Sequence, residues 1–500
     1  MISLLTVLIP LTWAFLIPLI HIFKKTWLKR AILLFGIAVF FVTISAAISG
    51  WKQSALSFLG GWPAELGIVF IVDKLSAAFL FLSAIGGGAA FLASYGRLKE
   101  GPWRYYVIFF LLQASMNGVL ITGDIFNLYV FYEVFSLAAY LLVAFTLSWQ
   151  AIEAGLKYLV LGTIGAFFIL LGIAYIFMAT GSLNMAVLSL TLPHIPNEAL
   201  TVIAASLLIG LFIKIGAFPA HFWLPDAHSS AQTAVSALLS GVVVKVSIYT
   251  LLRLSLLLFL DTKPAVFTVI TVVGTLSVLG GHLMALRQED IKRLLAYSTV
   301  AQIGYVLIGV GTGLAAGISA AFFHAINHMF MKVGLFIAAG HIAEDMKTRN
   351  IYDLRGLYHH RRWFVIVFSL LTAAIVGIPP LNGFMSKWYL MLAATKAGNV
   401  IPALAIAFGT VISAFYYMRV LSFFYSSGDP PPRQTNPYWN LVIAGACSLC
   451  CVFLGIVPSF RLFGSCFGYR PQCSRYGRIH IYDIVKMRLA SCLASIFLGW

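Results

Sequence analysis

Four lysines and one glutamate lie inside apolar stretches that are long enough to cross a membrane. The lysines are Lys214, Lys245, Lys332 and Lys387, and the acid is Glu133, in LYVFYEVFSLAAYLL. A charge at the centre of a membrane helix costs about 2.5–3.5 kcal/mol on insertion scales, so such residues mark functional sites by default. Any single one could instead snorkel to an interface or form a structural ion pair. One acid leaves most of the lysines unpaired, so the set indicates function.

Titratable side chains also line one face of the helix that carries Lys332. His324 and His328 precede it in steps of four residues. A zinc site is not expected, because no acidic or thiol ligand accompanies the two histidines and a protonated lysine repels a cation. Such a row is typical of a proton relay, since histidine and buried lysine can both exchange protons. His228, in PDAH, either belongs to this relay or caps a helix.

Two of the lysines stand beside residues that break helices. The breakers are Gly216 and Pro219 after Lys214, and Pro379, Pro380 and Gly383 before Lys387. Proline removes a backbone donor and clashes with the preceding turn. Non-helical backbone persists at membrane depth only when it is buried in protein or lines a watery cavity. Paired broken helices are typical of the transport site of inverted-repeat transporters. Two ordinary proline kinks are the alternative, and a lysine beside both favours transport.

The composition demands a membrane protein around these residues. Of the 500 residues, 61% are hydrophobic and 10% charged, against about 45–50% and about 25% in soluble domains. This excludes a cytosolic enzyme, a secreted disulfide scaffold and a disordered chain. Since a spanning helix needs about 20 apolar residues, we expect an all-α polytopic protein with about fourteen transmembrane helices. They are expected near 3–20, 31–49, 68–94, 104–122, 125–147, 157–178, 200–219, 230–255, 265–286, 294–311, 315–341, 362–391, 399–425 and 437–458.

The two broken segments are the seventh and twelfth spans, and this odd offset predicts two inverted five-helix repeats. We therefore expect helices 1–3 in 1–103, a first repeat of helices 4–8 in 104–255, a second of helices 9–13 in 265–425, helix 14 in 437–458, and a basic, cysteine-containing tail in 461–500. No function is assigned to the tail.

The net charge of +17 sets topology and does not indicate nucleic-acid binding. Clusters of Lys and Arg fall in alternate loops of the fourteen-span arrangement, which predicts an outside N-terminus by the positive-inside rule. No basic residue precedes the first apolar run, so no cleaved signal peptide is expected. All six cysteines lie at or beyond Cys447 in no zinc or cluster pattern. Without nucleotide, haem, flavin or iron–sulfur motifs, no cofactor is expected.

Five stretches resemble the antiporter-like subunits of respiratory complex I and of the Mrp cation/proton antiporters. They are GDIFNLYVFYEV (123–134), IKIGAFPAHFWLPDAHSSAQTAVSALLSGVVVK (213–245), EDIKRLLAYSTVAQIGY (289–305), HAINHMFMKVGLF (324–336) and GIPPLNGFMSKW (377–388). The chain most resembles the D-type branch of the Mrp antiporter family. It departs from its relatives at Gln232, where proline is usual, and in the tail beyond about residue 460. Lys387 stands where the M-type relatives of complex I carry glutamate.

The resemblance implies that Glu133 pairs with Lys214, and that Lys245 and Lys387 continue a hydrophilic axis joining two half-channels. Separating the pair would expel a proton along the row. The implied function is proton translocation within a multisubunit Na+/H+ antiporter.

This antiporter would lie in a bacterial cell membrane, with partner subunits of A, B, C, E, F and G type. The acid-poor interior suggests that sodium passes through another subunit. The alternatives are a proton-pumping subunit of a complex I-like dehydrogenase or membrane-bound hydrogenase, and a non-conducting scaffold, which has no use for the lysines. The chain itself is not expected to be an enzyme.

Overall fold

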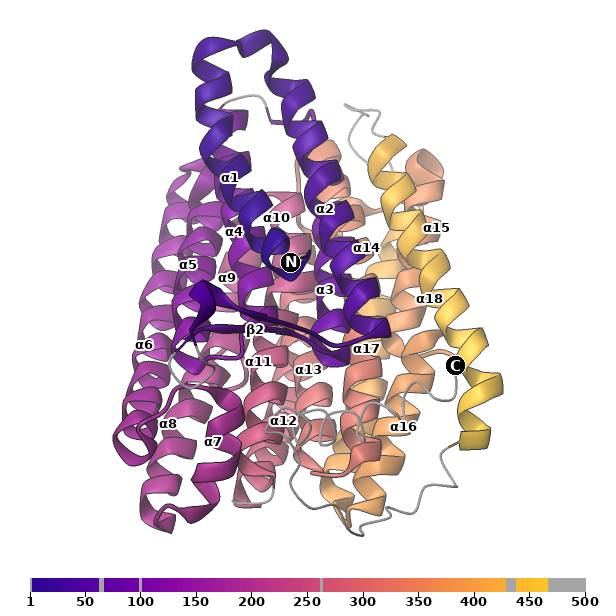
Figure 1. Ribbon diagram of the computed structural model, residues 1–500. Helices are drawn as coiled ribbons and strands as arrows, with labels where there is room; N and C mark the ends of the chain where they lie inside the picture. The colour runs from indigo at the N-terminus through magenta and orange to yellow at the C-terminus, as the bar shows by residue number, and fades with distance from the viewer. Residues whose placement is uncertain (1, 63–66, 99–100, 261–263, 429–437, 466–500) are drawn as a thin grey trace.

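The computed structural model describes residues 2–62, 67–98, 101–260, 264–428 and 438–465. Among them, thirteen helices are long and apolar enough to cross a membrane. Two further helices, α15 (Leu357–Val376) and α16 (Asn382–Lys396), are not among these thirteen. The expectation of an all-α polytopic protein with about fourteen spans is therefore confirmed (Figure 1).

The helices up to the first break are α1 (Ile2–Phe23), α2 (Leu28–Lys52), α3 (Lys74–Ser94), α4 (Pro102–Ile121), α5 (Ile125–Val143), α6 (Trp149–Thr180), the short α7 (Met185–Thr191) and α8 (Asn197–Ile215). After α9 (Trp223–Ser230), one continuous helix consists of α10 (Thr233–Leu238), the π-helical turn η5 (Leu239–Val243), α11 (Val244–Leu254) and the π-helical turn η6 (Ser255–Phe259). The remaining membrane helices are α12 (Ala265–Leu286), α13 (Ile291–Gly311), α14 (Ala315–Met346), α17 (Val400–Tyr425) and α18 (Tyr438–Ser465). The greater part of the expected tail, from residue 466 on, lies outside the described residues.

The expected span 68–94 is wrong in its first residues. Val69–Val72 forms strand β2, which pairs antiparallel with β1 (Ala55–Phe58). The helix begins only after Asp73, whose side chain accepts a 2.8 Å hydrogen bond from the backbone N–H of Ser76. An aspartate in this position satisfies an otherwise orphaned donor in the first turn. The helical part of the apolar run therefore begins at this N-cap, and its first residues belong to the hairpin.

Both expected helix breaks are present. Gly216 caps the C-terminus of α8 with φ +74°, and Gly377 caps that of α15 with φ +90°. Glycine adopts this left-handed conformation without steric cost, which is why it terminates helices. The expected span 200–219 therefore stops early, at Ile215, and the expected span 362–391 is two helices. Gly383 lies one residue inside α16, where an added Cβ would stand 1.8 Å from the carbonyl oxygen of Ala374.

Two matching backbone contacts lie five membrane crossings apart. Asp124 pairs with Asn184, and Asp290 pairs with Asn350, each through an isolated antiparallel bridge. In both pairs the aspartate caps a membrane helix, α5 or α13, and the asparagine caps the next short helical segment. The same number of residues separates the two partners in each pair. Because an odd number of crossings lies between them, the two contacts face opposite sides of the membrane.

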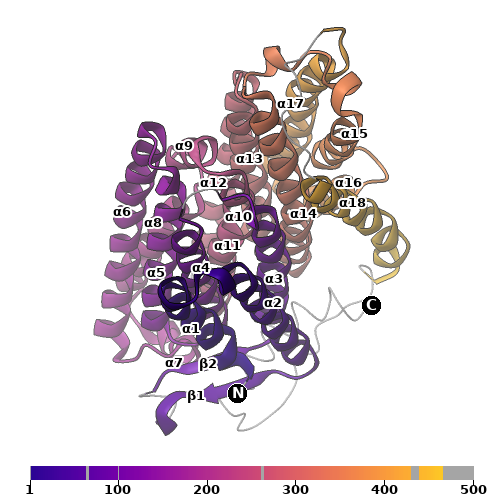
Figure 2. The ribbon, with the colours of Figure 1, turned by 90° about the horizontal axis from the view of Figure 1, so that it is seen from above.

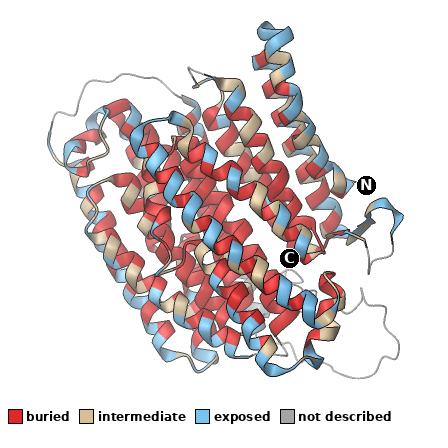
Figure 3. Cartoon of the chain, turned by 90° about the vertical axis from the view of Figure 1, so that its left-hand side faces the viewer, coloured by how far each residue is buried: buried red, intermediate tan, exposed pale blue. Residues whose placement is uncertain are grey.

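The centre of the bundle is protein interior and not lipid-facing surface. In the most apolar part of Thr233–Phe259 every residue is buried, and in Ile291–Gly311 94% are, against 39% in Trp149–Thr180. Seen from above, α5, α6 and α8 lie at one end, α15, α16 and α17 at the other, and α11, α13 and α14 between them (Figure 2). Buried positions concentrate on the inward faces (Figure 3). Polar groups on the central helices are thus shielded from lipid.

A buried ion pair that we did not expect fastens α11 to the start of α3. Arg253 lies in the expected span 230–255, and its Nη1 stands 2.5 Å from Oδ2 of Asp73. It also donates to Ser76 Oγ at 2.9 Å and to the hydroxyl of Tyr249 at 3.1 Å. Only 3% of the Arg253 side chain is exposed. The partners satisfy a charge that would otherwise be isolated in the interior.

Removing the carboxylate from this pair should destabilise the fold. Asp73→Asn keeps an oxygen for capping α3 but leaves Arg253 buried without a counter-charge, and breaking one side of such a pair costs about 3–5 kcal/mol. Thermal unfolding of the purified protein in detergent measures the loss. Glu153→Gln, in the exposed pair Lys157–Glu153, is the control and should leave the transition unchanged. An unchanged transition in Asp73→Asn would contradict the assignment.

Candidate functional site

The ion pair expected between α5 and α8 is present. Lys214 Nζ lies 3.0 Å from Glu133 Oε1 and 2.8 Å from Ser136 Oγ. The Lys214 side chain is 2% exposed, whereas 36% of Glu133 is exposed at the edge of the bundle. Lys214 stands in the last turn of α8, directly before the first helix break. The more accessible carboxylate is the partner that can change its surroundings.

A tyrosine and a serine connect this pair to the middle of the bundle. The Lys214 ammonium lies 5.2 Å from the centroid of the Tyr132 ring. The Tyr132 hydroxyl in turn donates to the hydroxyl of Ser247 in α11, two residues after Lys245. The Tyr132 hydroxyl thus joins α5, beside the ion pair, to α11, the helix that carries Lys245.

Lys245 faces a histidine instead of an acid. Its Nζ lies 2.8 Å from Nδ1 of His328 and 2.5 Å from the carbonyl oxygen of Ser240, and its residue is 1% exposed. When Lys245 is an ammonium, His328 must be neutral and accept at Nδ1, because an ammonium can only donate. The contact then holds one proton between two bases, each of which can carry it.

The two histidines of α14 continue the row toward α16. The rings of His328 and His324 are nearly parallel, with centroids 6.2 Å apart. His324 contacts Ser386 Oγ through Nδ1 and Gln302 Oε1 through Nε2, both at 2.9 Å. The Ser386 hydroxyl has a second acceptor, the Gly383 carbonyl oxygen at 3.2 Å. It can therefore reverse its hydrogen bond to His324 when that ring gains a proton.

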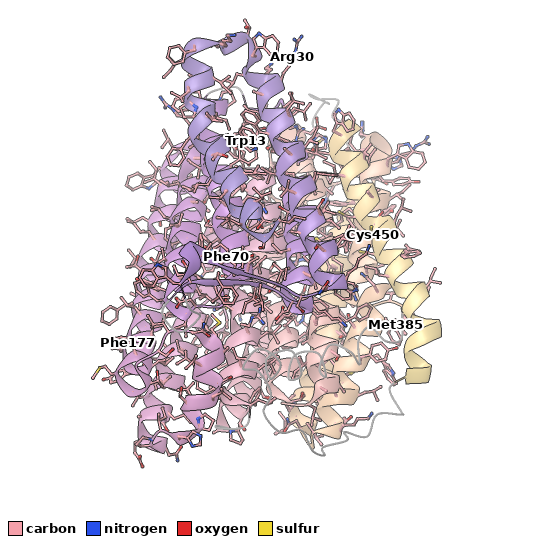
Figure 4. All side chains as sticks on the ribbon, in the orientation of Figure 1. Trp13, Arg30, Phe70, Phe177, Met385 and Cys450 are labelled. Carbon is pink, nitrogen blue, oxygen red and sulfur yellow. The ribbon has the colours of Figure 1, made fainter. Side chains whose placement is uncertain are left out.

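Lys387, the neighbour of Ser386, occupies the second helix break. Its Nζ donates to the carbonyl oxygens of Ile375 and Val376, both at 3.0 Å. These belong to the last turn of α15, where carbonyls lose their helical partners. Its residue is 3% exposed, and Nζ lies 5.0 Å from the centroid of the Tyr305 ring. The label of Met385, two residues before Lys387, shows where α16 begins in Figure 4.

The first break satisfies its backbone differently. There the indole Nε1 of Trp223 donates to the Ile213 carbonyl at 2.9 Å, and the backbone N–H of Phe218, next to Pro219, donates to Ser277 Oγ at 3.0 Å. Lys214 binds side chains, whereas Lys387 binds the backbone of the broken helix. The similar spacing of lysine and breakers in the sequence thus corresponds to two different local arrangements.

Lys332 and His228 lie beside the row and not within it. Lys332 Nζ donates to the Leu295 carbonyl at 2.7 Å and to Ser298 Oγ at 2.9 Å. Its ammonium lies 5.7 Å from the Phe336 ring centroid, and the His228 ring stacks on the same Phe336 at 4.7 Å. Within the described part of the chain, neither ring nitrogen of His228 has a hydrogen-bond partner. Phe336 separates His228 from the hydrogen-bonded network.

The charge balance of the site points to proton exchange. Among the described residues, no carboxylate lies within 4.0 Å of Lys245, Lys332 or Lys387. In the same part of the chain, no group of three His, Cys, Asp or Glu side chains could hold a metal ion. Several ammonium groups confined without counter-charges repel one another and lose their hydration. The cluster is most stable when protons are shared among fewer of its bases.

The sequence analysis missed five participants: Tyr132, Ser136, Ser247, Gln302 and Ser386. Each is a neutral polar residue within an apolar helix, and nothing in its local pattern separates it from a packing residue. Ser386 alone offered a signal, since it adjoins Lys387 and follows the break.

Two family models match the chain. Residues 122–413, which contain every residue of the row, match the transmembrane model of NADH:quinone oxidoreductases and Mrp antiporters. Residues 4–123 match the amino-terminal model of NADH-ubiquinone oxidoreductase chain 4.

Similar proteins lead to the same family. The chain is 37% identical to the N-type subunit of the NADH-quinone oxidoreductase of Desulforudis audaxviator, over 75% of this chain and 76% of that one. It is 31% identical to the D-type subunit of the Na+/H+ antiporter of Alkalihalophilus pseudofirmus, over 86% and 89%. Among solved structures, a chain of the archaeal membrane-bound sulfane sulfur reductase superposes with a TM-score of 0.86 at 29% identity, covering 91% of this chain and 94% of the other. The protein therefore belongs to the NADH:quinone oxidoreductase/Mrp antiporter family of membrane proteins.

Proposed function

We propose that this chain is the proton-translocating subunit of a multisubunit Na+/H+ antiporter in the bacterial cell membrane, with its N-terminus outside. The observation that carries the proposal is the buried row from Glu133 through Lys214, Lys245 and the α14 histidines to Lys387. Hydrogen bonds join Glu133 to Lys214, Lys245 to His328, and His324 to Ser386, and each of these bonds joins groups that can hold or pass a proton. The helices that carry the row extend from α5 and α8 at one end of the bundle to α16 at the other (Figure 2).

The ion pair acts as the switch of this row. With Glu133 at 3.0 Å, Lys214 is held as an ammonium. When Glu133 moves away or is neutralised, that ammonium loses its stabilisation and gives up its proton. The change in charge then shifts protons at Lys245, His328 and His324 toward Lys387. A cation or a neighbouring subunit that attracts Glu133 could drive the switch, since the carboxylate is partly exposed.

The repeats expected at 104–255 and 265–425 are part of the proposal. The two Asp–Asn contacts support them, because they place equivalent caps in equivalent positions on opposite sides of the membrane. Each repeat then supplies one broken helix, α8–α9 or α15–α16. Two half-channels of opposite orientation, joined through Lys245 and His328, would connect both sides of the membrane.

The partners follow from the names of the relatives. The Na+/H+ antiporter relative is by its name one subunit of an assembly, and the sulfane sulfur reductase is a respiratory membrane complex. We infer that this chain assembles with antiporter subunits of A, B, C, E, F and G type within the lipid bilayer. Because the row holds a single carboxylate, we place the sodium path in a partner and the proton path here.

A second candidate, favoured by the 37% identity to a quinone oxidoreductase relative, is a proton-pumping subunit of a redox complex. The composition of the complex purified from its native membrane decides between the two. An antiporter yields only membrane subunits and Na+-driven proton flux. Co-purifying iron–sulfur or flavin subunits would assign the chain to a redox complex.

Loss of the switch should stop proton movement. Glu133→Ala leaves the buried Lys214 without its counter-charge, and we expect Na+-driven proton flux in everted vesicles to be abolished while the complex still assembles. Glu133→Asp keeps the charge at shorter reach and should retain partial flux. Glu198→Ala, which removes an acid from the first turn of α8, is the matched control. Undiminished flux in Glu133→Ala at equal complex abundance would refute the role.

The last lysine should need to release its proton as well as carry it. We expect Lys387→Ala to stop flux. We expect Lys387→Arg to fail nearly as badly, because arginine stays protonated in proteins. Lys387→Glu should retain some transport, since glutamate titrates and relatives carry it there. Proton flux in everted vesicles, at matched abundance, compares the three. Full activity in Lys387→Arg would show that this position supplies only fixed positive charge.

A further inference from the structure

A second set of buried polar groups lies behind the row, on α12, α13 and α17. His282 of α12 is fully buried, yet both of its ring nitrogens have hydrogen-bond partners. Nε2 lies 2.8 Å from the Tyr305 hydroxyl of α13, and Nδ1 lies 3.1 Å from the Tyr416 hydroxyl of α17. A neutral imidazole donates through one nitrogen and accepts through the other. The three side chains therefore form a series of hydrogen bonds in which donation runs in one direction, and this direction can be reversed.

Ring contacts place each end of this hydrogen-bonded series near a lysine of the site. The Tyr305 ring contacts the Lys387 ammonium and also the His324 ring, whose centroid is 5.6 Å away. At the other end, the rings of Tyr416 and Tyr417 lie 4.6 Å apart. The Tyr417 hydroxyl is 2.9 Å from Ser298 Oγ, which accepts from Lys332 at 2.9 Å. Hydrogen bonds through Ser298 therefore extend from Lys332 to Tyr417, whose ring packs against that of Tyr416.

A glycine beside His282 allows α12, α13 and α17 to pack closely. Gly409 of α17 faces the pair, and a Cβ there would stand 2.7 Å from the Tyr305 hydroxyl and 2.8 Å from Cδ2 of His282. Any larger residue would displace one of the two partners. The absence of a side chain at this point lets three helices bring their polar groups within hydrogen-bond distance in the protein interior.

We propose that His282, with Tyr305 and Tyr416, is a further proton-transferring site that links Lys332 to Lys387 in parallel with the histidines of α14. The proposal rests on the proposed function, since it adds a branch to the same relay. A proton reaching the Tyr416 oxygen from the Ser298 side releases the Tyr416 proton to Nδ1. Nε2 then gives its proton to the Tyr305 oxygen, and the original Tyr305 proton leaves toward Lys387. No charge remains on the branch, and its hydrogen bonds end reversed.

The branch is tested by proton flux in everted vesicles at matched complex abundance. Tyr416→Phe removes one hydroxyl without changing the packing volume. Because the parallel path through the α14 histidines remains, we expect flux to fall by roughly two- to tenfold and not to stop. His282→Gln should cause a similar loss. The control Tyr425→Phe removes a hydroxyl from the same helix, where it contacts Ser369 away from the branch, and should leave flux unchanged.

The double variant separates transfer from packing. The hydrogen bonds of the branch act in series. The proton flux of the double variant Tyr416→Phe, His282→Gln should therefore be no lower than that of the slower single variant. Losses that multiply would mean that the groups only brace the helices, and would overturn the proposal. Wild-type flux in Tyr416→Phe, with Glu133→Ala inactive, would remove the branch and leave the relay. Wild-type flux in Glu133→Ala as well would reject the proposed function and, with it, the branch.

Discussion

An ammonium group in a membrane protein must find acceptors or lose its proton, and this constraint governs the interior of the bundle. Of the four lysines, only Lys214 is paired with a carboxylate from the described part of the chain, at 3.0 Å from Glu133. Lys245, Lys332 and Lys387 rest on carbonyl oxygens, a hydroxyl and an imidazole. Such neutral acceptors satisfy hydrogen bonds but do not balance charge. Protonation of one base in the cluster therefore depends on the charge of the others, and a change in the charge of Glu133 alters proton binding throughout the row.

The helix breaks follow from the same constraint. A continuous helix uses its own carbonyls, whereas the broken α15 leaves two of them free to accept from Lys387. The broken α8 ends with Lys214 in its last turn, within reach of α5. Irregular backbone of this kind is tolerable only in the protein interior, which the surrounding helices provide (Figure 3). The breaks and the charged groups stabilise one another.

The sequence predicted most of this fold because membrane helices are long, apolar and separated by charge. The expected span 265–286 matches α12 at both ends, and the family resemblance is confirmed by the matching models. Helix boundaries were predicted wrongly where a single local interaction sets them. At Asp73, the capping hydrogen bond makes α3 begin at Lys74 and not at residue 68.

Titratable residues of the site stood out against apolar surroundings. Its hydroxyls and amides did not, and their partners come from distant helices, as with Ser247 and Tyr132. His282 carried the same signal as the other histidines and was overlooked, because no second titratable residue stands near it in the sequence.

The central claim is that one proton path runs through both halves of the bundle, and Lys245 is the link between them. Its contact with His328 at 2.8 Å is where the row passes a proton from lysine to histidine. Lys245→Arg preserves the positive charge but cannot release a proton. The most direct measurement is proton flux through the purified complex in liposomes under an imposed membrane potential, for this variant and the wild type. The account predicts that the intact variant complex conducts no protons above the background of empty liposomes, and wild-type flux would contradict it.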